Sequence, residues 1–456
     1  MKNNKYTPVI GLEIHVELKT KSKMFCQCDA DYFGKEPNTN TCPVCLGLPG
    51  ALPVPNRKAI EWTIKIGQAL NCTINKSSKF DRKHYFYSDL PKAYQISQYD
   101  QPIAVNGELR IDNYELENSK KYRITRVHLE EDTGKLTHSG VDSLVDFNRS
   151  SVPLVEIVTE PDFDNSEDVK KFLEELHTII KYLDVSDANM EEGSMRMEPN
   201  ISLSVIANRA ERMKSLPNYK VEVKNINSFN FAKKAIEYEL KRQAEILDSG
   251  KTPTQETRGY DDKKGITYSQ RSKEDAHDYR YFPEPDIPPM VFSDEQIENI
   301  RKTLPELPHE KVARYLSDYG LKYADAFILT RTIELSNYYE KVFTKLRNNR
   351  SLLKLNYTLE QVTASDIVNK KIPTNINLDN FVEKFIKLHE LVEVDKDKLI
   401  EVIKNIIEKN SVQIEQYKKG KIGLLGYFVG QVMKEMNGKA EPRIVRSKLH
   451  EEINKV

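Results

Sequence analysis

Apolar and polar residues alternate strictly over residues 9–18, which read Val-Ile-Gly-Leu-Glu-Ile-His-Val-Glu-Leu. This period of two predicts a β-strand with one apolar face and an opposite face that carries Glu13, His15 and Glu17. The polar row could be a solvated sheet surface or half of a site for a hard cation and a transferred phosphate. The alternation alone leaves these two interpretations equally open.

Strand and helix signals are interspersed through the first 290 residues. Two helices carry serine N-cap signals, because Ser166 precedes an apolar stripe that runs to Leu183 and Ser228 precedes one that runs to Leu240. The further strand candidates are residues 122–129, 152–158, 201–206 and 221–223. This part of the chain is therefore expected to be a mixed α/β domain.

A proline-rich stretch at residues 281–290 interrupts the pattern and predicts a domain boundary. Beyond it strand signals nearly vanish, and a second interruption at 370–377 precedes two more helices and a glycine-containing end at 420–439. The helices expected directly after the boundary cover residues 295–303, 308–319, 323–335 and 338–347. The predicted fold class is α+β, with an N-terminal mixed α/β domain, then an all-α helical domain and a small α-helical tail domain.

Composition and missing motifs exclude several classes of protein. The 69 basic and 69 acidic residues cancel, so any contact with nucleic acid must come from local patches and not from net charge. The N-terminus has no apolar signal region, and no segment approaches the ~18 apolar residues of a membrane span. A cytoplasmic protein without membrane contact is expected. The chain has no G-x-x-x-x-G-K-[ST] loop, G-x-G-x-x-G fingerprint or G-x-S-x-G elbow, so any ATP must be bound by another kind of cradle.

Four of the five cysteines form two short pairs with thirteen residues between them, namely Cys26, Cys28, Cys42 and Cys45. Two such knuckles can fold onto one tetrahedral Zn²⁺, and in a reducing compartment a metal is favoured over disulfides. Four protein ligands leave no open coordination position, so the predicted zinc is structural and clips the intervening loop. Cys72, the fifth cysteine, is expected to be an inert core residue.

Carboxylates gather in two other predicted strands. Glu130, Glu131 and Asp132 follow one another just before a glycine turn, where they could hold a divalent ion or form an acidic turn. Glu156 interrupts a strand that is otherwise apolar on both faces, so a metal or a basic residue is favoured as its partner over a chance surface position.

Two further segments combine charges with amides or aromatic rings. One strand face carries Glu222 and Lys224, and Asn225 and Ser228 then lead into a helix N-terminus. This arrangement is either a phosphate site or an ion pair followed by a helix cap, and the two are equally open. Residues 79–95 interleave cations with tyrosines, which suits a nucleotide or an RNA end nearly as well as ordinary aromatic packing.

Taken together, these segments resemble the B subunit of the aspartyl/glutamyl-tRNA amidotransferases, the GatB family, over nearly the whole chain. The motif His-Leu-Glu-Glu-Asp-Thr-Gly-Lys is one of the matching blocks. The archaeal sister protein, GatE, carries a large inserted domain for which 456 residues leave no room. The matching blocks are residues 9–18, 36–53, 79–87, 91–98, 128–135, 190–196 and 277–286.

The resemblance implies a two-step reaction on Glu-tRNA(Gln) and/or Asp-tRNA(Asn). ATP would phosphorylate the side-chain carboxylate, because a carboxylate cannot expel oxide, and ammonia would then displace the phosphate to give Gln-tRNA(Gln) or Asn-tRNA(Asn). In the family the ammonia comes through a channel from glutamine hydrolysis in the A subunit, and the small C subunit ties the other two together in a heterotrimer. The implied cofactors are ATP and Mg²⁺, with a structural Zn²⁺.

The resemblance also implies a magnesium site. Its ligands would be His15, Glu131 and Glu222, with Glu13 and Glu130 alongside. Period two instead puts Glu130 on the face shared with Arg126 and His128, so a bulge or a turn would have to bring Glu131 to the metal.

The remaining implied roles concern ATP and the tRNA end. Three lysines would stabilise phosphoryl charge, two tyrosines would pack on the nucleotide or the terminal adenine, and two arginines would bind the aminoacyl ester. These residues are Lys83, Lys92 and Lys224, then Tyr85 and Tyr87, then Arg149 and Arg196. Glu156, Asn225 and Ser228 are expected in the same region. At residues 197–200 the chain reads Met-Glu-Pro-Asn, where the family more often has Cys-Asp-Ala-Asn.

The implied architecture has three domains. A cradle domain over residues 1–292 would hold the kinase and transamidase site and the zinc knuckle, a helical domain would cover 293–405, and a YqeY-like tail domain over 406–456 would bind tRNA. The alternative is a noncatalytic zinc-containing tRNA-binding scaffold that keeps the fold without the chemistry.

Overall fold

The computed structural model describes residues 5–113, 118–205, 216–272, 279–353, 355–389, 396–436, 440 and 442–455. Two compact units divide between Asn337 and Tyr338. The first unit contains the sheets and the second is helical, which confirms the predicted α+β class. No helix within the described ranges is long and apolar enough to cross a membrane.

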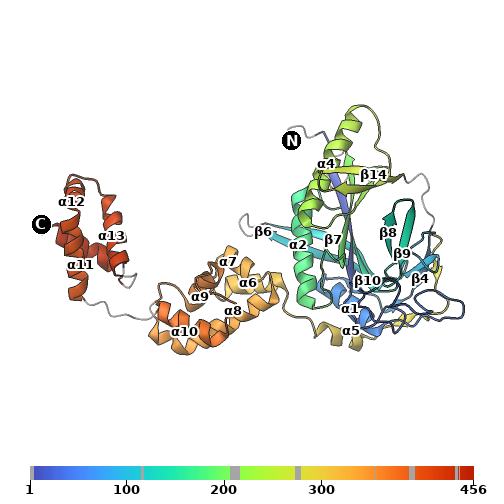
Figure 1. Ribbon diagram of the computed structural model, residues 1–456, viewed down its shortest axis with the longest axis horizontal. Helices are drawn as coiled ribbons and strands as arrows, with labels where there is room; N and C mark the ends of the chain where they lie inside the picture. The colour runs from blue at the N-terminus through green and yellow to red at the C-terminus, as the bar shows by residue number, and fades with distance from the viewer. Residues whose placement is uncertain are drawn as a thin grey trace. The chain divides into compact units, whose positions relative to one another are not determined.

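A nine-stranded sheet organises the first unit (Figure 1). Neighbouring strands are antiparallel except for the parallel pair β12 and β13. In spatial order the strands are β14 (Ile266–Ser272), β13 (Glu256–Asp261), β12 (Val221–Lys224), β11 (Met195–Ser204), β1 (Thr7–Glu17), β10 (Pro153–Thr159), β7 (Asn118–Glu131), β6 (Ala104–Asn113) and β2 (Thr73–Ile74). All five strands predicted from apolar patterning correspond to strands of this sheet. The one predicted over 201–206 ends at Ser204 in β11, and residue 206 lies outside the described residues.

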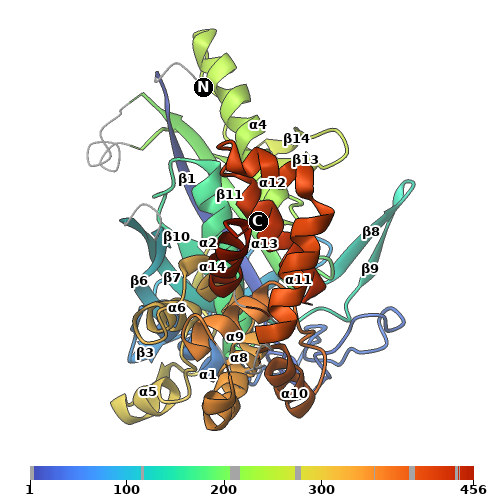
Figure 2. The ribbon, with the colours of Figure 1, turned by 90° about the vertical axis from the view of Figure 1, so that its left-hand side faces the viewer.

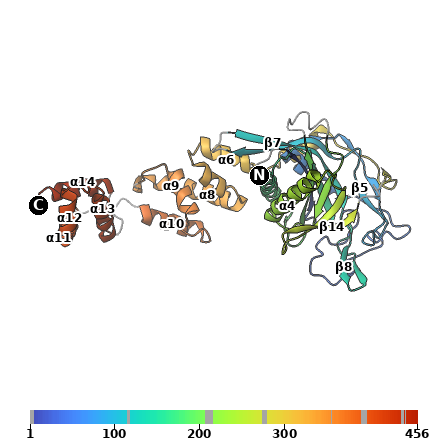
Figure 3. The same cartoon turned by 90° about the horizontal axis from the view of Figure 1, so that it is seen from above.

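Three helices, α1 (Arg57–Ala69), α2 (Ser166–Leu183) and α4 (Phe229–Asp248), pack on the sheet. Helices α2 and α4 lie side by side (Figure 1), and α4 lies beside β14 (Figure 3). The apolar residues of β1, such as Ile10 and Ile14, are fully buried in the core that these helices share with the sheet. Ser228 caps α4 as predicted, since its hydroxyl accepts a hydrogen bond from the Phe231 amide. The predicted cap of α2 was wrong by one position: the side chain of Asn165 caps the helix, and Ser166 is its first residue.

Smaller sheets and a hairpin complete the strand-rich part of the first unit. The proline-rich stretch pairs back onto the cradle at both ends, because β15 (Phe282–Pro283) joins β4 (Asp81–His84) and β5 (Tyr94–Ser97) while β16 (Met290–Val291) joins β3 (Ser77–Ser78). The hairpin of β8 (Lys135–Ser139) and β9 (Asp142–Asp146) extends away from the main sheet (Figure 2).

Helices follow as predicted, with one exception. After α5 (Asp294–Arg301) and α6 (Pro308–Ser317), the helix expected over residues 323–335 is divided into α7 (Tyr323–Leu329) and the start of α8 (Ile333–Leu346). The break has a tertiary cause, because the Tyr182 hydroxyl donates to the Thr330 carbonyl at 2.9 Å and Arg331 pairs with Glu175 of α2 at 2.8 Å.

The second unit is described by itself. Its first part comprises the end of α8, a 3₁₀ turn (Arg347–Leu352), α9 (Leu359–Val368) and α10 (Leu378–His389). Its last part has a separate core around Ile403, Phe428 and Val445. That core is formed by α11 (Lys396–Lys409), α12 (Ser411–Lys418), α13 (Leu424–Glu435) and α14 (Pro442–Ile453).

Candidate active site

One face of the large sheet is lined with charged residues from five adjacent strands. Strand register sets this arrangement, because His15 of β1 lies opposite Glu156 of β10, which lies opposite His128 of β7. On the other side, Glu13 lies opposite Glu198 of β11. Paired residues share a face of the sheet, and so does every second residue along a strand. The polar row predicted for β1 therefore extends across the sheet. The apolar β1 residues lie on the other face, in the core that the helices cover.

The first group on this face, the imidazole–carboxylate cluster, consists of His15, His128, Glu130 and Glu156. The shortest contact joins His128 Nε2 to Glu156 Oε2 at 3.1 Å. His15 Nε2 lies 3.7 Å from Glu130 and 3.8 Å from Glu156. His15 Nδ1 is buried and has no hydrogen-bond partner among the described residues. His15, Glu130 and Glu156 each offer a ligand atom, and these atoms lie within 4.8 Å of one another.

Neighbouring cations keep the carboxylates of this cluster ionised. Burial by itself would raise the pKa of Glu156, but the charge and hydrogen bond of His128, together with the charges of His15 and Lys83, hold that pKa well below its usual range. Burial likewise opposes ionisation of Glu130, whose pKa is still lowered by His128 and Lys83. Burial disfavours the charged form of Lys83, yet Glu130 raises its pKa. Lys83 is therefore a cation held beside two anions.

The second group, the carboxylate cluster, brings together Glu13, Glu198 and Glu222, whose oxygens lie within 4.8 Å of one another. Lys224 is the neighbouring cation, 3.0 Å from Glu198 and 3.6 Å from Glu222. Burial raises the pKa of Glu198 despite this lysine. Sequence reasoning missed Glu198, although its spacing of two residues from Arg196 on a strand would have placed it on the same face.

The structure divides the expected magnesium ligands among different places. His15 belongs to the imidazole–carboxylate cluster and Glu222 to the carboxylate cluster, whereas Glu131 belongs to neither. Glu131 pairs with Lys92 at 2.8 Å and accepts a hydrogen bond from the Ile96 amide at 2.9 Å. The pairing of β7 with β10 runs without a bulge through Glu130 and Glu131, so alternation directs Glu130, not Glu131, toward His15.

The two arginines expected at the aminoacyl ester lie at the far end of β1. Arg196 pairs with Asp132 at 2.8 Å, and Arg149 lies 3.8 Å from the same carboxylate. Burial raises the pKa of Glu17 well above its usual range, and the charge of Asp132 raises it further. The Tyr32 hydroxyl donates to Glu17 at 3.1 Å. Glu17 and Tyr32 border a cavity of about 200 Å³.

The aromatic segment before β5 contributes a ring next to Lys83. The Lys83 amine lies 5.9 Å from the ring centre of Tyr85 and 5.1 Å from that of Tyr279. Tyr87 is 48 % exposed. Asn225 has a left-handed backbone at φ 61°, and its side chain donates to the Tyr268 hydroxyl at 3.3 Å. The hydroxyl of Ser228 is used in capping α4.

A larger cavity of about 370 Å³ lies against the opposite end of β1, beside the carboxylate cluster. Gly11, Glu13 and Asn200 line it together with apolar side chains such as Val158. The Asn200 amide nitrogen donates to Glu13 at 2.9 Å, which fixes the amide orientation. The Asn200 oxygen is then a buried acceptor without a partner in the described part of the chain.

The four clustered cysteines form a metal-ligand set in this same unit. The sulfurs of Cys26, Cys28, Cys42 and Cys45 all lie within 4.8 Å of one another. A hydrogen bond from Cys26 lowers the pKa of Cys45 to about 5, and the same hydrogen bond raises the pKa of Cys26. Cys72 is buried elsewhere in the core, as expected.

Comparison with known proteins identifies the family of the chain. Residues 8–298 match the model of the GatB/GatE catalytic domain, and residues 312–453 match that of the GatB domain. The chain is 46 % identical to the B subunit of the aspartyl/glutamyl-tRNA(Asn/Gln) amidotransferase of Caldicellulosiruptor saccharolyticus, over 99 % of this chain and 100 % of the relative. It is 45 % identical to the protein of the same name in Thermotoga maritima, over 96 % and 97 % of the two chains. The chain therefore belongs to the GatB family, the B subunits of the aspartyl/glutamyl-tRNA(Asn/Gln) amidotransferases.

Proposed function

We propose that this chain activates the side-chain carboxylate of Glu-tRNA(Gln) and/or Asp-tRNA(Asn) with ATP and then completes the amide with ammonia delivered by the glutaminase, the A subunit. Transfer of the γ-phosphoryl group makes phosphate the leaving group, and ammonia attack on the acyl phosphate then releases it. The observation that carries the proposal is the pair of buried acidic clusters on one sheet face, with Lys83 and Lys224 beside them.

The donor atoms on this face fit a divalent cation. The carboxylate cluster offers the oxygen ligands that Mg²⁺ prefers. The Nε2 atom of His15 lies 3.7 Å from Glu130 and 3.8 Å from Glu156, so these three side chains offer a second set of donor atoms to a cation. We propose that Glu13, Glu198 and Glu222, and His15 with its two carboxylate neighbours, hold Mg²⁺. The ion would neutralise phosphate charge.

The lysines have different roles in this proposal. Lys83 and Lys224 keep their charge and border the two acidic clusters, so they would stabilise charge on the transferred phosphoryl group. Lys92 forms an ion pair with Glu131, which also accepts a hydrogen bond from Ile96 of β5. The role of Lys92 would therefore be to hold β7 and β5 together beside the site.

The cavity beside the carboxylate cluster would receive the nucleoside of ATP. Its volume of about 370 Å³ lies in the range of small-molecule pockets. Apolar walls suit a base, and an amine or hydroxyl of the nucleoside would satisfy the Asn200 oxygen. The phosphates would then extend along β1 toward Glu13 and His15.

The aminoacyl end of the tRNA would approach the polar face of β1 from the Glu17 end, opposite the cavity proposed for the nucleoside. Arg149 and Arg196 would bind the ester region, and the rings of Tyr85 and Tyr87 would pack on the terminal adenine. The glutaminase A subunit and the small C subunit would complete the heterotrimer, and the tail domain over 406–456 would contact the tRNA.

A structural Zn²⁺ on the four cysteines completes the proposal. It would hold the loop between Cys28 and Cys42 against the cradle. Metal analysis of the purified chain should give one zinc per chain, and Cys42→Ser should abolish it.

The activity is tested by assembling the chain with the A and C subunits and supplying Glu-tRNA(Gln) or Asp-tRNA(Asn), ATP and Mg²⁺. Amidated tRNA should form with either glutamine or free ammonia. An assembled complex that binds tRNA but forms no product from either ammonia source would contradict the proposal and favour a noncatalytic scaffold.

A further inference from the structure

The Thr257 hydroxyl of strand β13 faces the acidic side of the sheet. The parallel pairing of β12 with β13 sets Thr257 opposite Glu222. The Thr257 hydroxyl donates to Glu222 Oε2 at 2.9 Å. The other carboxylate oxygen, Oε1, lies 3.6 Å from the Lys224 amine. The hydrogen bond and the ion pair both act on the orientation of the Glu222 carboxylate.

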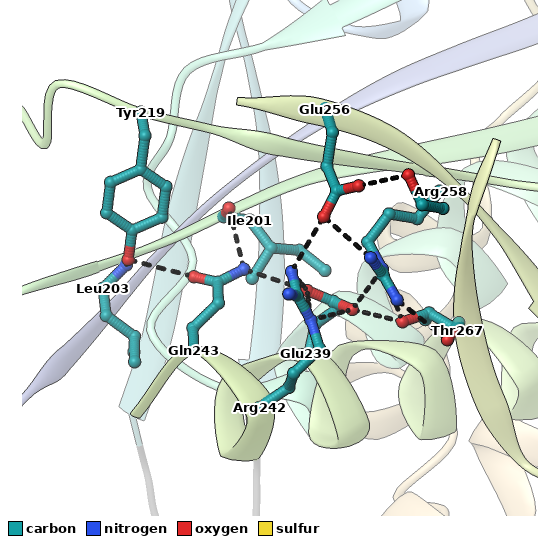
Figure 4. A network of polar contacts seen from close by, with 10 residues as sticks. Ile201, Leu203, Tyr219, Glu239, Arg242, Gln243, Glu256, Arg258 and Thr267 are labelled. Atoms are coloured by element: carbon teal, nitrogen blue, oxygen red, sulfur yellow. Dashed lines mark hydrogen bonds and ion pairs between the residues drawn. The ribbon is translucent and has the colours of Figure 1, made fainter. Parts of the chain in front are cut away.

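The neighbours of Thr257 point to the opposite face of β13, where a balanced ionic network holds the strand against α4 (Figure 4). The Arg258 guanidinium lies 3.1 Å from Glu239 and 2.7 Å from Glu256. Arg242 lies 2.8 Å from Glu239, whose side chain is 0 % exposed. Two arginines thus meet two carboxylates in a buried setting, which leaves β13 little freedom to shift.

The same network continues to β11 through α4. Gln243 donates to Glu239 at 3.2 Å and accepts from the Tyr219 hydroxyl at 3.2 Å, and that hydroxyl accepts from the Leu203 amide at 3.1 Å (Figure 4). Strand β11 carries Glu198. Helix α4 is therefore connected to β11 on one side of the carboxylate cluster and to β13 on the other.

Close packing of β14 on β13 restricts the strand further. Gly259 lies opposite Lys224, and a Cβ at this glycine would come within 2.6 Å of the Tyr268 hydroxyl. That hydroxyl accepts a hydrogen bond from Asn225 at 3.3 Å. The β13–β14 strand pair therefore contacts Glu222 of β12 through Thr257, and it contacts Asn225 through Tyr268.

We infer that Thr257 is a positioning residue for the reaction: its hydroxyl aims the Glu222 carboxylate into the carboxylate cluster, and the Glu239–Arg258 network holds Thr257 in register. The inference rests on the proposed function, in which Glu222 binds the metal. Residues that orient metal ligands in this way change metal affinity or activity by about 10- to 100-fold when they are lost.

The test is the affinity of the full chain for Mn²⁺, measured by calorimetry on four variants. Thr257→Val keeps the β-branched shape but removes the hydroxyl, and Thr257→Ala removes it in a smaller side chain. We expect the Mn²⁺ dissociation constant to rise by about 10-fold or more in both. Thr257→Ser should return it to within about twofold of the wild-type value, because the hydroxyl is restored.

Ser269→Ala is the matched control. The Ser269 hydroxyl donates to Glu256 at 2.6 Å on the other face of β13, so this variant loses a bond of the same kind away from the cluster. Its Mn²⁺ affinity should stay within about twofold of wild type. A purely structural role for Thr257 predicts that its variants and Ser269→Ala change thermal stability alone.

The outcomes separate this inference from the proposed function. If the wild-type chain binds Mn²⁺ and both hydroxyl-free variants of Thr257 bind it equally well, the positioning role is contradicted and the proposed function stands. If the wild-type chain binds no Mn²⁺, the metal site of the proposed function is contradicted, and this inference with it.

Discussion

The two faces of β13 hold carboxylates in opposite electrostatic settings. Behind the strand, Glu239 and Glu256 meet Arg242 and Arg258, so the buried charges cancel. In front of it, three carboxylates share Lys224, with Lys220 only 4.0 Å from Glu13 at the margin. Removing one partner from a balanced buried network is strongly destabilising, whereas an unbalanced cluster costs free energy unless a cation joins it. The surplus of negative charge distinguishes the face that we propose to be functional.

The largest effect on stability should come from breaking the balanced side. Glu239→Ala removes the fully buried carboxylate between the partly buried Arg242 and Arg258, which keep Glu256 as a partner, so we expect the free energy of unfolding to fall by about 3 kcal/mol. Denaturant unfolding measures it. Glu245→Ala, an exposed position on the same helix, should change it by less than about 0.5 kcal/mol. Equal effects in the two variants would contradict the structural role of the network.

A smaller effect should follow from filling the cavity beside the carboxylate cluster. Gly11→Val projects a side chain into it, so binding of a nonhydrolysable ATP analogue should weaken by about 10-fold, or about 1.4 kcal/mol. Gly11→Ala is the control, because its Cβ would meet its nearest neighbours at 3.6–3.8 Å, which are ordinary contacts. Unchanged binding in Gly11→Val would place the nucleoside elsewhere.

The smallest effect concerns pH. Burial, and then Asp132, raise the pKa of Glu17, so the folded chain retains a proton that the unfolded chain releases above about pH 4.3. The contribution of Glu17 to stability therefore falls as pH rises from about 4.3 through the raised pKa. Glu17→Gln cannot titrate, so its free energy of unfolding should fall less than that of wild type between about pH 5 and 7. Parallel curves would contradict the raised pKa.

The sequence predicted local features better than it predicted which residues meet. Alternation in β1 correctly predicted the two faces of that strand. Alternation in β7 likewise indicated that Glu130, and not Glu131, shares a face with His128. It could not predict that Glu198 joins Glu13, because the register between β1 and β11 spans more than 180 residues and depends on tertiary packing. Glu198 also lies where the chain departs from the family's usual motif.

The helix boundaries show the same limit. The helical pattern over residues 323–335 is continuous in the sequence, but contacts with Tyr182 and Glu175 of α2 divide it. The cap of α2 was misplaced because Asn165 and Ser166 are both good N-cap residues, and only the backbone decides between them.

The most direct test of the central claim is tRNA-dependent ADP formation by the assembled complex carrying Glu222→Gln. The acidic face is proposed to carry out phosphoryl transfer, so ADP formation with Glu-tRNA(Gln) should fall by about 100-fold or more, while complex assembly and tRNA binding persist. Glu245→Gln should retain wild-type ADP formation. Wild-type ADP formation by the Glu222→Gln complex would contradict the account.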